Sequence, residues 1–288
     1  MSAVEFRNVT YSYDSIEKEK KYALKNVSFK IEQGDYVCLV GHTGSGKTTI
    51  LKHIGGILKP ESGEILINGV DILKGKNSFK NVSKDIGFVF QNPGYQLFEE
   101  TVEKDIAFGP MNFGFGEEEI KKRVLRAADL VGLDEKLLNK SPFELSGGQK
   151  RRVAIAGVIA TSPKILLLDE PTCGLDPMGK EKILNIIKRY NEEEKATVLV
   201  VTHNMNDIFS YAKKILVLNK GEVFSYCGVD ETFKKFEELK EIGLDIPDIA
   251  KVFLELKKRG LVERNDVYSV EEAFKVIKNI LLKKEIKN

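Results

Sequence analysis

Residues 36–48 read Tyr-Val-Cys-Leu-Val-Gly-His-Thr-Gly-Ser-Gly-Lys-Thr, and this stretch decides the fold. An apolar run of strand length, Tyr36–Val40, leads directly into a G-x-x-x-x-G-K-[ST] motif at Gly41–Thr48, and a helical pattern follows. Glycines let consecutive backbone N–H groups curl around an anion, because a Cβ would obstruct the turn. We therefore predict a phosphate loop between a buried strand and a helix that begins near Lys47, and hence a site for a nucleoside triphosphate.

The residues of this loop have distinct expected roles. Lys47 would reach the β- and γ-phosphates, and the Thr48 hydroxyl would bind Mg²⁺. The predicted nucleotide-binding residues of the loop are Gly41, His42, Thr43, Gly44, Ser45, Gly46, Lys47, Thr48 and Thr49. The alternative, a glycine-rich turn met by chance, would not require all four fixed positions to be filled between a strand and a helix.

Length and composition limit the classes of protein to consider. The 288 residues suit one large domain, or a main domain with a small appendage. The 45 Lys and Arg nearly cancel the 43 Asp and Glu, so overall charge does not favour nucleic acid as a partner. The cysteines Cys38, Cys173 and Cys227 are scattered and odd in number, which predicts a reducing compartment without disulfides. No segment approaches the ~18 uninterrupted apolar residues of a membrane span, so we expect any work at a membrane to go through another protein.

Four apolar runs of strand length each end beside polar residues suited to phosphate chemistry. Besides the run before the phosphate loop, they are Ile86–Phe90 before Gln91, Ile165–Leu168 before Asp169 and Glu170, and Val198–Val201 before Thr202 and His203. Near-continuous apolar runs separated by helical stretches predict a parallel sheet that is covered on both faces. Ligands of such sheets lie outside the carboxyl ends of the strands, so we expect the four tips to converge on one site.

The segments around this core have other patterns. Val4–Tyr13 and Leu24–Ile31 alternate apolar and polar residues, as half-exposed antiparallel strands do, and the charged stretch Ser15–Lys21 between them is expected to be a loop. Residues 61–70 predict a further strand that is closed by an Asn-Gly turn. Residues from about 92 to 160 predict a helical insert in the sheet domain. Its periodic apolar positions are Ile120, Val124, Ala127 and Val131, and its expected breaks are Pro110, Gly114 and Gly116.

Beyond about residue 230 the chain predicts amphipathic helices. Apolar residues recur at helical spacing at Ile249, Val252, Phe253 and Leu256, and again at Val270, Ala273, Phe274 and Ile277. Ser269 and Glu272 have the spacing of a capping box. The 13 basic and 13 acidic residues after position 229 cancel, which argues against a nucleic-acid arm. Two alternatives stay open: a helical tail packed on its own domain, or an appendage for dimerisation or regulation, which we favour.

Residues 145–149, Leu-Ser-Gly-Gly-Gln, predict a second anion-binding helix start. Ser146 is a good N-cap, and two glycines leave the backbone amides of the first turn open. A tight turn is the alternative, but the string lies before the strand that ends in Asp169 and Glu170, which favours a functional role.

These motifs together resemble those of the ATP-binding cassette (ABC) ATPases. The phosphate loop, Gln91, the signature Leu145–Gln149 (Leu145, Ser146, Gly147, Gly148 and Gln149), the Walker B run Ile165–Glu170, the D-loop Gly174-Leu175-Asp176 and His203 occur in the family's order. The resemblance covers residues 4 to about 228. It implies an α/β P-loop NTPase cassette over residues 1–229, with a mostly parallel core sheet, an N-terminal antiparallel β subdomain and the helical insert, followed by a small helical C-terminal extension over 230–288. By this likeness Tyr13 would stack on adenine, with Tyr11 as the competing candidate.

A finer resemblance is to the ATPases of energy-coupling factor (ECF) transporters, which import vitamins and trace metal ions. Gln91–Val102, Asp105–Pro110 and Arg151–Gly157 look like the corresponding ECF segments, and residues 95–100 look like the second of the two paired ATPases, called A-prime. Asn204 stands where many relatives have Asp, and Cys173 stands where they have Ala or Ser. Neither departure removes a group that the chemistry needs.

The expected chemistry is hydrolysis of ATP with Mg²⁺. Glu170 would polarise the attacking water, and His203 would contact the γ-phosphate and hold Glu170 in place. Gln91 would complete the metal shell or the water network. The predicted catalytic residues are therefore Glu170, His203 and Gln91, and the predicted metal ligands are Thr48, Gln91 and Asp169.

The resemblance also implies partners. Two ATPases would sandwich two nucleotides, with Leu145–Gln149 and Asp176 of one subunit acting on the other's nucleotide. The second subunit would be a paralogous ECF ATPase or a second copy. A membrane coupling (T) subunit would dock near Gln91–Glu100 on the cytoplasmic face of the cell membrane, and substrate-binding (S) subunits would act indirectly. Tyr95 and Phe98 would contact the T subunit or pack within the insert.

Two other classes of protein also contain a phosphate loop of this kind. A soluble ABC ATPase acting on ribosomes or DNA usually carries a second cassette or a long coiled coil, and the 105 residues between Gly41 and Ser146 leave room for neither. A small-molecule kinase would not need residues 145–149. The transported substrate is not encoded in this chain, since the resemblance assigns specificity to a separate membrane subunit.

Overall fold

The computed structural model describes residues 1–13, 21–75 and 77–285. Its core is a six-stranded sheet in the order β10-β9-β3-β8-β7-β6, and a second, four-stranded sheet has the order β2-β1-β4-β5. The loop predicted over 15–21 lies outside the described residues, apart from Lys21.

The small sheet is antiparallel, as the alternating pattern predicted. Its strands are β1 (Ser2–Ser12), β2 (Tyr22–Glu32), β4 (Ser62–Ile67) and β5 (Val70–Asp71). β1 pairs with both β2 and β4, and the rings of Phe6 and Phe29 stack across the β1–β2 pair with centroids 4.6 Å apart. The predicted Asn68-Gly69 turn joins β4 to β5.

The core sheet is mostly parallel. Its strands are β3 (Tyr36–Val40), β6 (Ile86–Val89), β7 (Ile165–Asp169), β8 (Thr197–Val201), β9 (Lys214–Asn219) and β10 (Glu222–Gly228). The four strands predicted from apolar runs are parallel neighbours, and β10 alone among the six pairs antiparallel in the described chain. All residues of β3, β7 and β8 are buried, which explains why their sequences are apolar without alternation.

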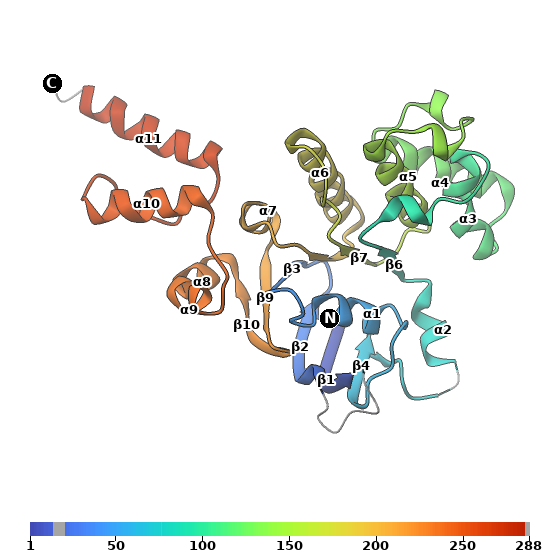
Figure 1. The fold of residues 1–288 in the computed structure, drawn as a ribbon. Coiled ribbons are helices and arrows are strands. Elements are labelled where there is room, and N and C mark those ends of the chain that lie inside the picture. Colours follow the sequence, from blue (N-terminus) through green and yellow to red (C-terminus); the bar gives the residue numbers. More distant parts are fainter. Residues whose placement is uncertain (14–20, 76, 286–288) are drawn as a thin grey trace.

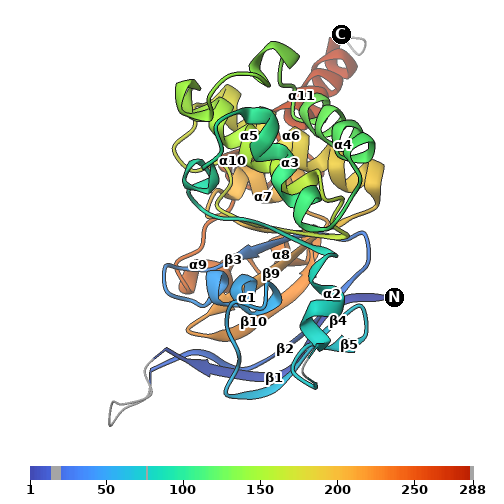
Figure 2. The same cartoon turned by 90° about the vertical axis from the view of Figure 1, so that its right-hand side faces the viewer.

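The core sheet separates two apolar clusters. Successive residues of a strand point to opposite faces, so Val37 and Leu39 join α1 and the small sheet, whereas Cys38 and Val40 join the helices on the other face. Figures 1 and 2 both show α1 (Lys47–Ile54) on the side of the small sheet and α6 (Pro177–Glu194) and α7 (Met205–Tyr211) on the opposite side. Both faces of the core sheet are therefore covered, as predicted.

The helical insert lies on the same side as α6. It contains α3 (Val102–Asn112), α4 (Glu117–Leu130), α5 (Gly147–Ile159) and the short 3₁₀ turns η1 (Pro93–Gln96), η2 (Glu135–Leu137) and η3 (Pro142–Glu144). The short α2 (Ser78–Ser83) precedes β6. The expected break at Pro110 is wrong, because α3 continues through it to Asn112. Pro110 cannot donate to the Ile106 carbonyl oxygen, but α3 continues for two residues beyond it, while Gly114 and Gly116 do separate α3 from α4.

The first part of the C-terminal extension packs on the cassette, as one of the two alternatives expected, while a role in dimerisation or regulation stays a prediction. Its helices are α8 (Val229–Lys234), α9 (Phe236–Glu241), α10 (Asp248–Lys258) and α11 (Val270–Glu285). Phe233, Leu239 and Ala250 pack into the core of the cassette, so α8, α9 and the start of α10 are continuous with it. A separate small cluster around Phe253 and Ala273 joins α10 to α11, and this hairpin projects from the body of the molecule (Figure 1).

One of the two hydrogen bonds of the predicted capping box is present at the start of α11. Ser269 Oγ accepts a hydrogen bond from the Glu272 N–H at 3.2 Å, whereas the Glu272 carboxylate accepts one from Arg264 Nη2 at 2.8 Å. Among the described residues, no helix combines the length and the apolar character needed to cross a membrane.

Candidate nucleotide-binding site

The phosphate loop connects β3 to α1 and depends on glycine at two positions. Gly46 is the N-cap of α1 with φ 105°, and a Cβ there would lie 2.6 Å from the Ala23 carbonyl oxygen. At Gly41, with φ 152°, a Cβ would lie 2.4 Å from Ser45 Oγ. The loop therefore passes so close to β2 and to itself that larger residues would be excluded at these points.

The side chain of Lys47 is held over the phosphate loop by backbone carbonyl oxygens of that loop. Its Nζ donates to the carbonyl oxygens of Gly41 at 2.7 Å and His42 at 2.9 Å. Burial lowers the pKa of Lys47, and the nearby carboxylates of Glu170 and Asp169 oppose that shift. The ammonium group is thus placed where a β/γ-phosphate would supply its missing counter-charge.

Asp169 and Thr48 form the oxygen pair expected for Mg²⁺. Thr48 Oγ1 donates to Asp169 Oδ1 at 3.2 Å, across the gap between α1 and the end of β7. Burial raises the pKa of Asp169, and the Thr48 hydrogen bond partly opposes the rise. The described residues contain no cluster of three or more His, Cys, Asp or Glu that would bind a metal on its own. A hydroxyl and one buried carboxylate fit Mg²⁺, which usually takes few protein ligands and completes its shell with phosphate and water.

Glu170 follows directly at the tip of β7 and meets two predicted partners. Its carboxylate lies 3.3 Å from His203 Nδ1 and accepts a hydrogen bond from Gln91 Nε2 at 3.4 Å. The Glu170 backbone is left-handed, with φ 49°, and its N–H donates to the Val201 carbonyl oxygen at 2.9 Å. A non-glycine residue in this conformation costs about 1 kcal/mol, and such strain is typical of functional sites. The structure thus brings Gln91, Glu170 and His203 together from three strand ends.

These groups border a pocket of about 440 Å³. The predicted residues that line it are Tyr13, Thr43, Gly44, Gly46, Lys47, Thr48, Thr49, Gln91 and Glu170. It is also lined by Lys21, Tyr22, Ala23 and Val201, which were not predicted from the sequence. Tyr22 and Ala23 begin β2 and Lys21 directly precedes it. The backbone of this strand approaches Gly46, and no local sequence motif predicts that contact.

The position of Tyr13 separates it from its competitor. Tyr13 lies on the pocket, and its Oη lies 3.1 Å from Thr49 Oγ1. Tyr11 lies behind it, in edge-to-face contact with the rings of Tyr13 at 5.0 Å and His53 at 4.8 Å. Of the two tyrosines considered from the sequence, Tyr13 is therefore the one placed to present its ring to a base, and Tyr11 supports it.

The signature segment is formed but lies away from this pocket. Ser146 caps α5 in a complete capping box: its Oγ accepts from the Gln149 N–H, and Gln149 Oε1 accepts from the Ser146 N–H at 2.9 Å. Side chains added at Gly147 or Gly148 would enter open space within this chain. Asp176 caps α6 by accepting from the Gly179 N–H at 2.9 Å. None of residues 145–149 or Asp176 is among the described residues that line the nucleotide pocket.

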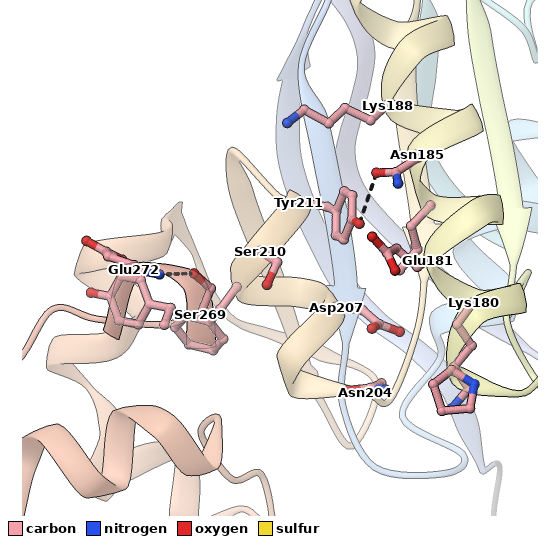
Figure 3. Close-up of a pocket in the computed structure, with 14 residues that line it drawn as sticks. Lys180, Glu181, Asn185, Lys188, Asn204, Asp207, Ser210, Tyr211, Ser269 and Glu272 are labelled. Atoms are coloured by element: carbon pink, nitrogen blue, oxygen red, sulfur yellow. Dashed lines mark hydrogen bonds between the residues drawn. The ribbon is translucent and has the colours of Figure 1, made fainter. Parts of the chain in front are cut away.

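A larger crevice of about 650 Å³ lies between α6, α7 and the start of α11 (Figure 3). Asp207 and Glu181 face it from opposite helices, and Tyr211 Oη donates to Asn185 Oδ1 at 3.1 Å across it. The described residues that line this crevice include none of the predicted site residues. Its size alone therefore does not make it the functional site.

The phosphate loop and the carboxylates at the strand tips define the class: a P-loop nucleoside triphosphatase whose signature helix stands apart from its own pocket. Comparisons with known proteins agree. A family model described as ABC transporter matches residues 24–173. The solved structure of cbiO1 from Clostridium perfringens, described as part of the ABC transporter complex cbiONQ, is similar with a TM-score of 0.74 and 35% identity, covering 84% of this chain and 94% of that one. The ATP-binding cassette MJ0796, solved as a dimer bound to ADP and Pi, gives a TM-score of 0.71 and 36% identity over 78% of this chain and 98% of that one.

Curated relatives narrow the class further. The energy-coupling factor transporter ATP-binding protein EcfA2 of Caldanaerobacter subterraneus subsp. tengcongensis is 50% identical over 270 residues, 94% of each chain. EcfA2 of Clostridium perfringens is 45% identical over 280 residues, 97% of this chain and 98% of the relative. The chain belongs to the ABC transporter family and, within it, to the energy-coupling factor transporter ATP-binding proteins. It is an ATPase subunit that energises transport, and the soluble, non-transport alternative finds no support in these relatives.

Proposed function

We propose that this chain works as one of two ATPase subunits of an importer of vitamins or trace metal ions, docked on a membrane coupling subunit at the cytoplasmic face of the membrane. One observation carries the proposal: Ser146 and Gly147 expose a capped helix start that does not border the chain's own pocket. The free N–H groups of such a helix start favour an anion. Because this helix start does not border the chain's own pocket, we assign to it a nucleotide held by another subunit. MJ0796, solved as a dimer, supports this arrangement.

In the proposed reaction each group has one task. Lys47 and the amides of the loop bind the β- and γ-phosphates, and the Ser146 helix of the partner binds the γ-phosphate from the other side. Mg²⁺, held by Thr48, Asp169 and Gln91, would supply charge neutralisation. Glu170 accepts a proton from the attacking water, and His203 keeps the Glu170 carboxylate directed at that water.

The C-terminal hairpin is proposed to contribute to the dimer. Val270, Phe274, Ile277 and Leu281 lie at i, i+4, i+7 and i+11 on α11, and all four are exposed. Residues at this spacing form one stripe along a helix, and an exposed apolar stripe marks an interaction surface. We assign this stripe to the second ATPase, a paralogous ECF ATPase or another copy of this chain.

The insert is proposed to carry the contact with the membrane coupling subunit. Tyr95, in η1, is 90% exposed, whereas Phe98 is 56% exposed and packs edge-to-face on Phe108 with centroids 4.7 Å apart. Tyr95 therefore suits a protein contact best, and Phe98 contributes while holding the insert together. Both lie a few residues beyond Gln91, so a shift at the nucleotide would be transmitted to the membrane subunit.

Replacing the Ser146 cap by a bulky side chain tests the shared nucleotide. Ser146→Arg should leave ATP binding by the isolated full-length chain within about twofold, and lower ATP turnover by at least about 100-fold. Ser78→Arg, a change at a half-buried position on the distant α2, is the matched control and should alter neither. Loss of ATP binding by Ser146→Arg would place the signature in the chain's own pocket and contradict the proposal.

A second experiment tests the proposed assembly. The tagged full-length chain should be isolated from membranes together with a second ATPase and a polytopic membrane protein, identified by mass spectrometry. Isolation of the tagged chain without any membrane protein would contradict the proposed transporter assembly.

A further inference from the structure

Arg151 connects two parts of the site that lie far apart in the sequence. It lies on α5, one turn after the Ser146 cap, and its Nη1 donates to the backbone carbonyl oxygen of Cys173 at 2.6 Å. Burial lowers the pKa of Arg151, but a guanidinium stays protonated because its ordinary pKa lies far above neutral pH. The bond is thus a short, charge-assisted contact from a partly buried cation, and such bonds are stronger than those between neutral groups.

The carbonyl that Arg151 holds closes the turn that carries Glu170. The Cys173 N–H donates back to the Glu170 carbonyl oxygen at 3.2 Å, and Thr172 is buried between them. Glu170 itself is left-handed, with φ 49°, a conformation that persists only when its surroundings enforce it. Fixing the end of this turn therefore restricts the backbone from which the Glu170 carboxylate projects.

We propose that Arg151 is a positioning residue that couples the signature helix to the turn of the catalytic base. The inference rests on the proposed dimer, in which the signature helix serves the partner's nucleotide while Glu170 serves the chain's own. Movement of α5 when Ser146 engages the partner's ATP is passed through one guanidinium to Cys173 and so to Glu170. Arg151 then links the two nucleotide sites within a single chain.

The experiment compares Arg151→Leu with Arg151→Lys in the full-length chain together with the subunits that purify with it. Arg151→Leu removes the donor, and should lower kcat for magnesium-dependent ATP hydrolysis at least about tenfold, because small misplacements of a catalytic group are costly. The Kd for ATP should stay within about twofold, since Arg151 does not line the pocket. The Hill coefficient for ATP should fall towards one.

Arg151→Lys keeps a charged donor and should recover part of kcat. Arg189→Leu is the matched control, because Arg189 is an exposed arginine on α6 paired with Glu193, and it should change none of these values.

The order of the turn can be measured separately through Cys173, which is exposed while Cys38 is buried. Arg151→Leu should raise the rate of maleimide labelling at Cys173 severalfold, with an unchanged thermal melting temperature. A wild-type kcat and Hill coefficient in Arg151→Leu, or an unchanged labelling rate, would overturn the inference. Absence of ATP hydrolysis by the wild-type assembly would instead count against the proposed function.

Discussion

The nucleotide pocket and the crevice between α6, α7 and α11 are built from different parts of the molecule. Backbone loops at the carboxyl ends of strands form the smaller pocket, about 440 Å³, and place Lys47, Asp169 and Glu170 at one edge. Helix side chains form the larger crevice, about 650 Å³, with Asp207 on α7 and Glu272 on α11. Strand ends converge at fixed positions, whereas helix faces meet wherever packing leaves space. The chemistry at the strand ends, and not the volume, therefore identifies the site.

Glu170→Gln should give the largest effect and test the chemistry of the smaller pocket. Gln keeps the shape and can still accept the Gln91 hydrogen bond, but it cannot take a proton from water. We expect kcat to fall about 1000-fold while ATP binding is retained and the closed dimer accumulates. Release of inorganic phosphate measures kcat, and an equilibrium titration measures ATP binding. Near-normal hydrolysis would remove Glu170 from its role.

Lys47→Ala should have the next largest effect, on binding rather than on turnover. The β/γ charge would lose the cation that the loop carbonyls of Gly41 and His42 hold in place. The expected loss of ATP affinity is at least about 100-fold, measured by an equilibrium titration. The same titration with Lys188→Ala, which changes a lysine of the crevice, should show unchanged affinity. Equal losses of ATP affinity in Lys47→Ala and Lys188→Ala would contradict the assignment of ATP to the pocket rather than to the crevice.

Tyr13→Ala should weaken ATP binding about tenfold, because stacking of a base on an aromatic ring contributes roughly 1–3 kcal/mol. Tyr13→Phe keeps the ring and loses the contact with Thr49, so its affinity should stay near that of the wild type. A larger loss in Tyr11→Ala than in Tyr13→Ala would reverse the assignment made from the pocket.

Tyr211→Phe should have the smallest effect and test the crevice. It removes the hydroxyl that bonds Asn185 and should lower the free energy of unfolding by about 0.5–1.5 kcal/mol. Denaturant unfolding would measure this change. ATP turnover should be unaltered, and a tenfold loss would show that the crevice takes part in the reaction.

The strand tips could be predicted from the sequence because the pattern is local. An uninterrupted apolar run followed by a polar residue reports burial on both faces and the point where the strand emerges. The same reasoning placed the Ser146 cap, since a Ser followed by Gln three residues later specifies its own helix start. The prediction failed at Pro110, where α3 continues for two residues although the proline cannot donate to Ile106.

Other features depended on contacts between distant segments. The wall formed by Ala23 against Gly46, the contact of Tyr13 with Thr49 and the bond from Arg151 to Cys173 each join segments that the chain order does not place together. In the same way, the apolar spacing in the extension predicted helices but not their neighbours. Phe233 and Leu239 pack into the cassette, while Phe274 on α11 stays exposed.

The sequence alone was enough to predict a phosphate loop at the edge of a parallel sheet and a nucleotide site on it, because each motif dictates its own backbone geometry. Only the three-dimensional packing shows that Tyr13 rather than Tyr11 lines the pocket, that the signature lies outside it and that Arg151 bonds the end of the Glu170 turn. These features depend on side-chain packing between segments far apart in the chain, and local patterns carry no record of that packing.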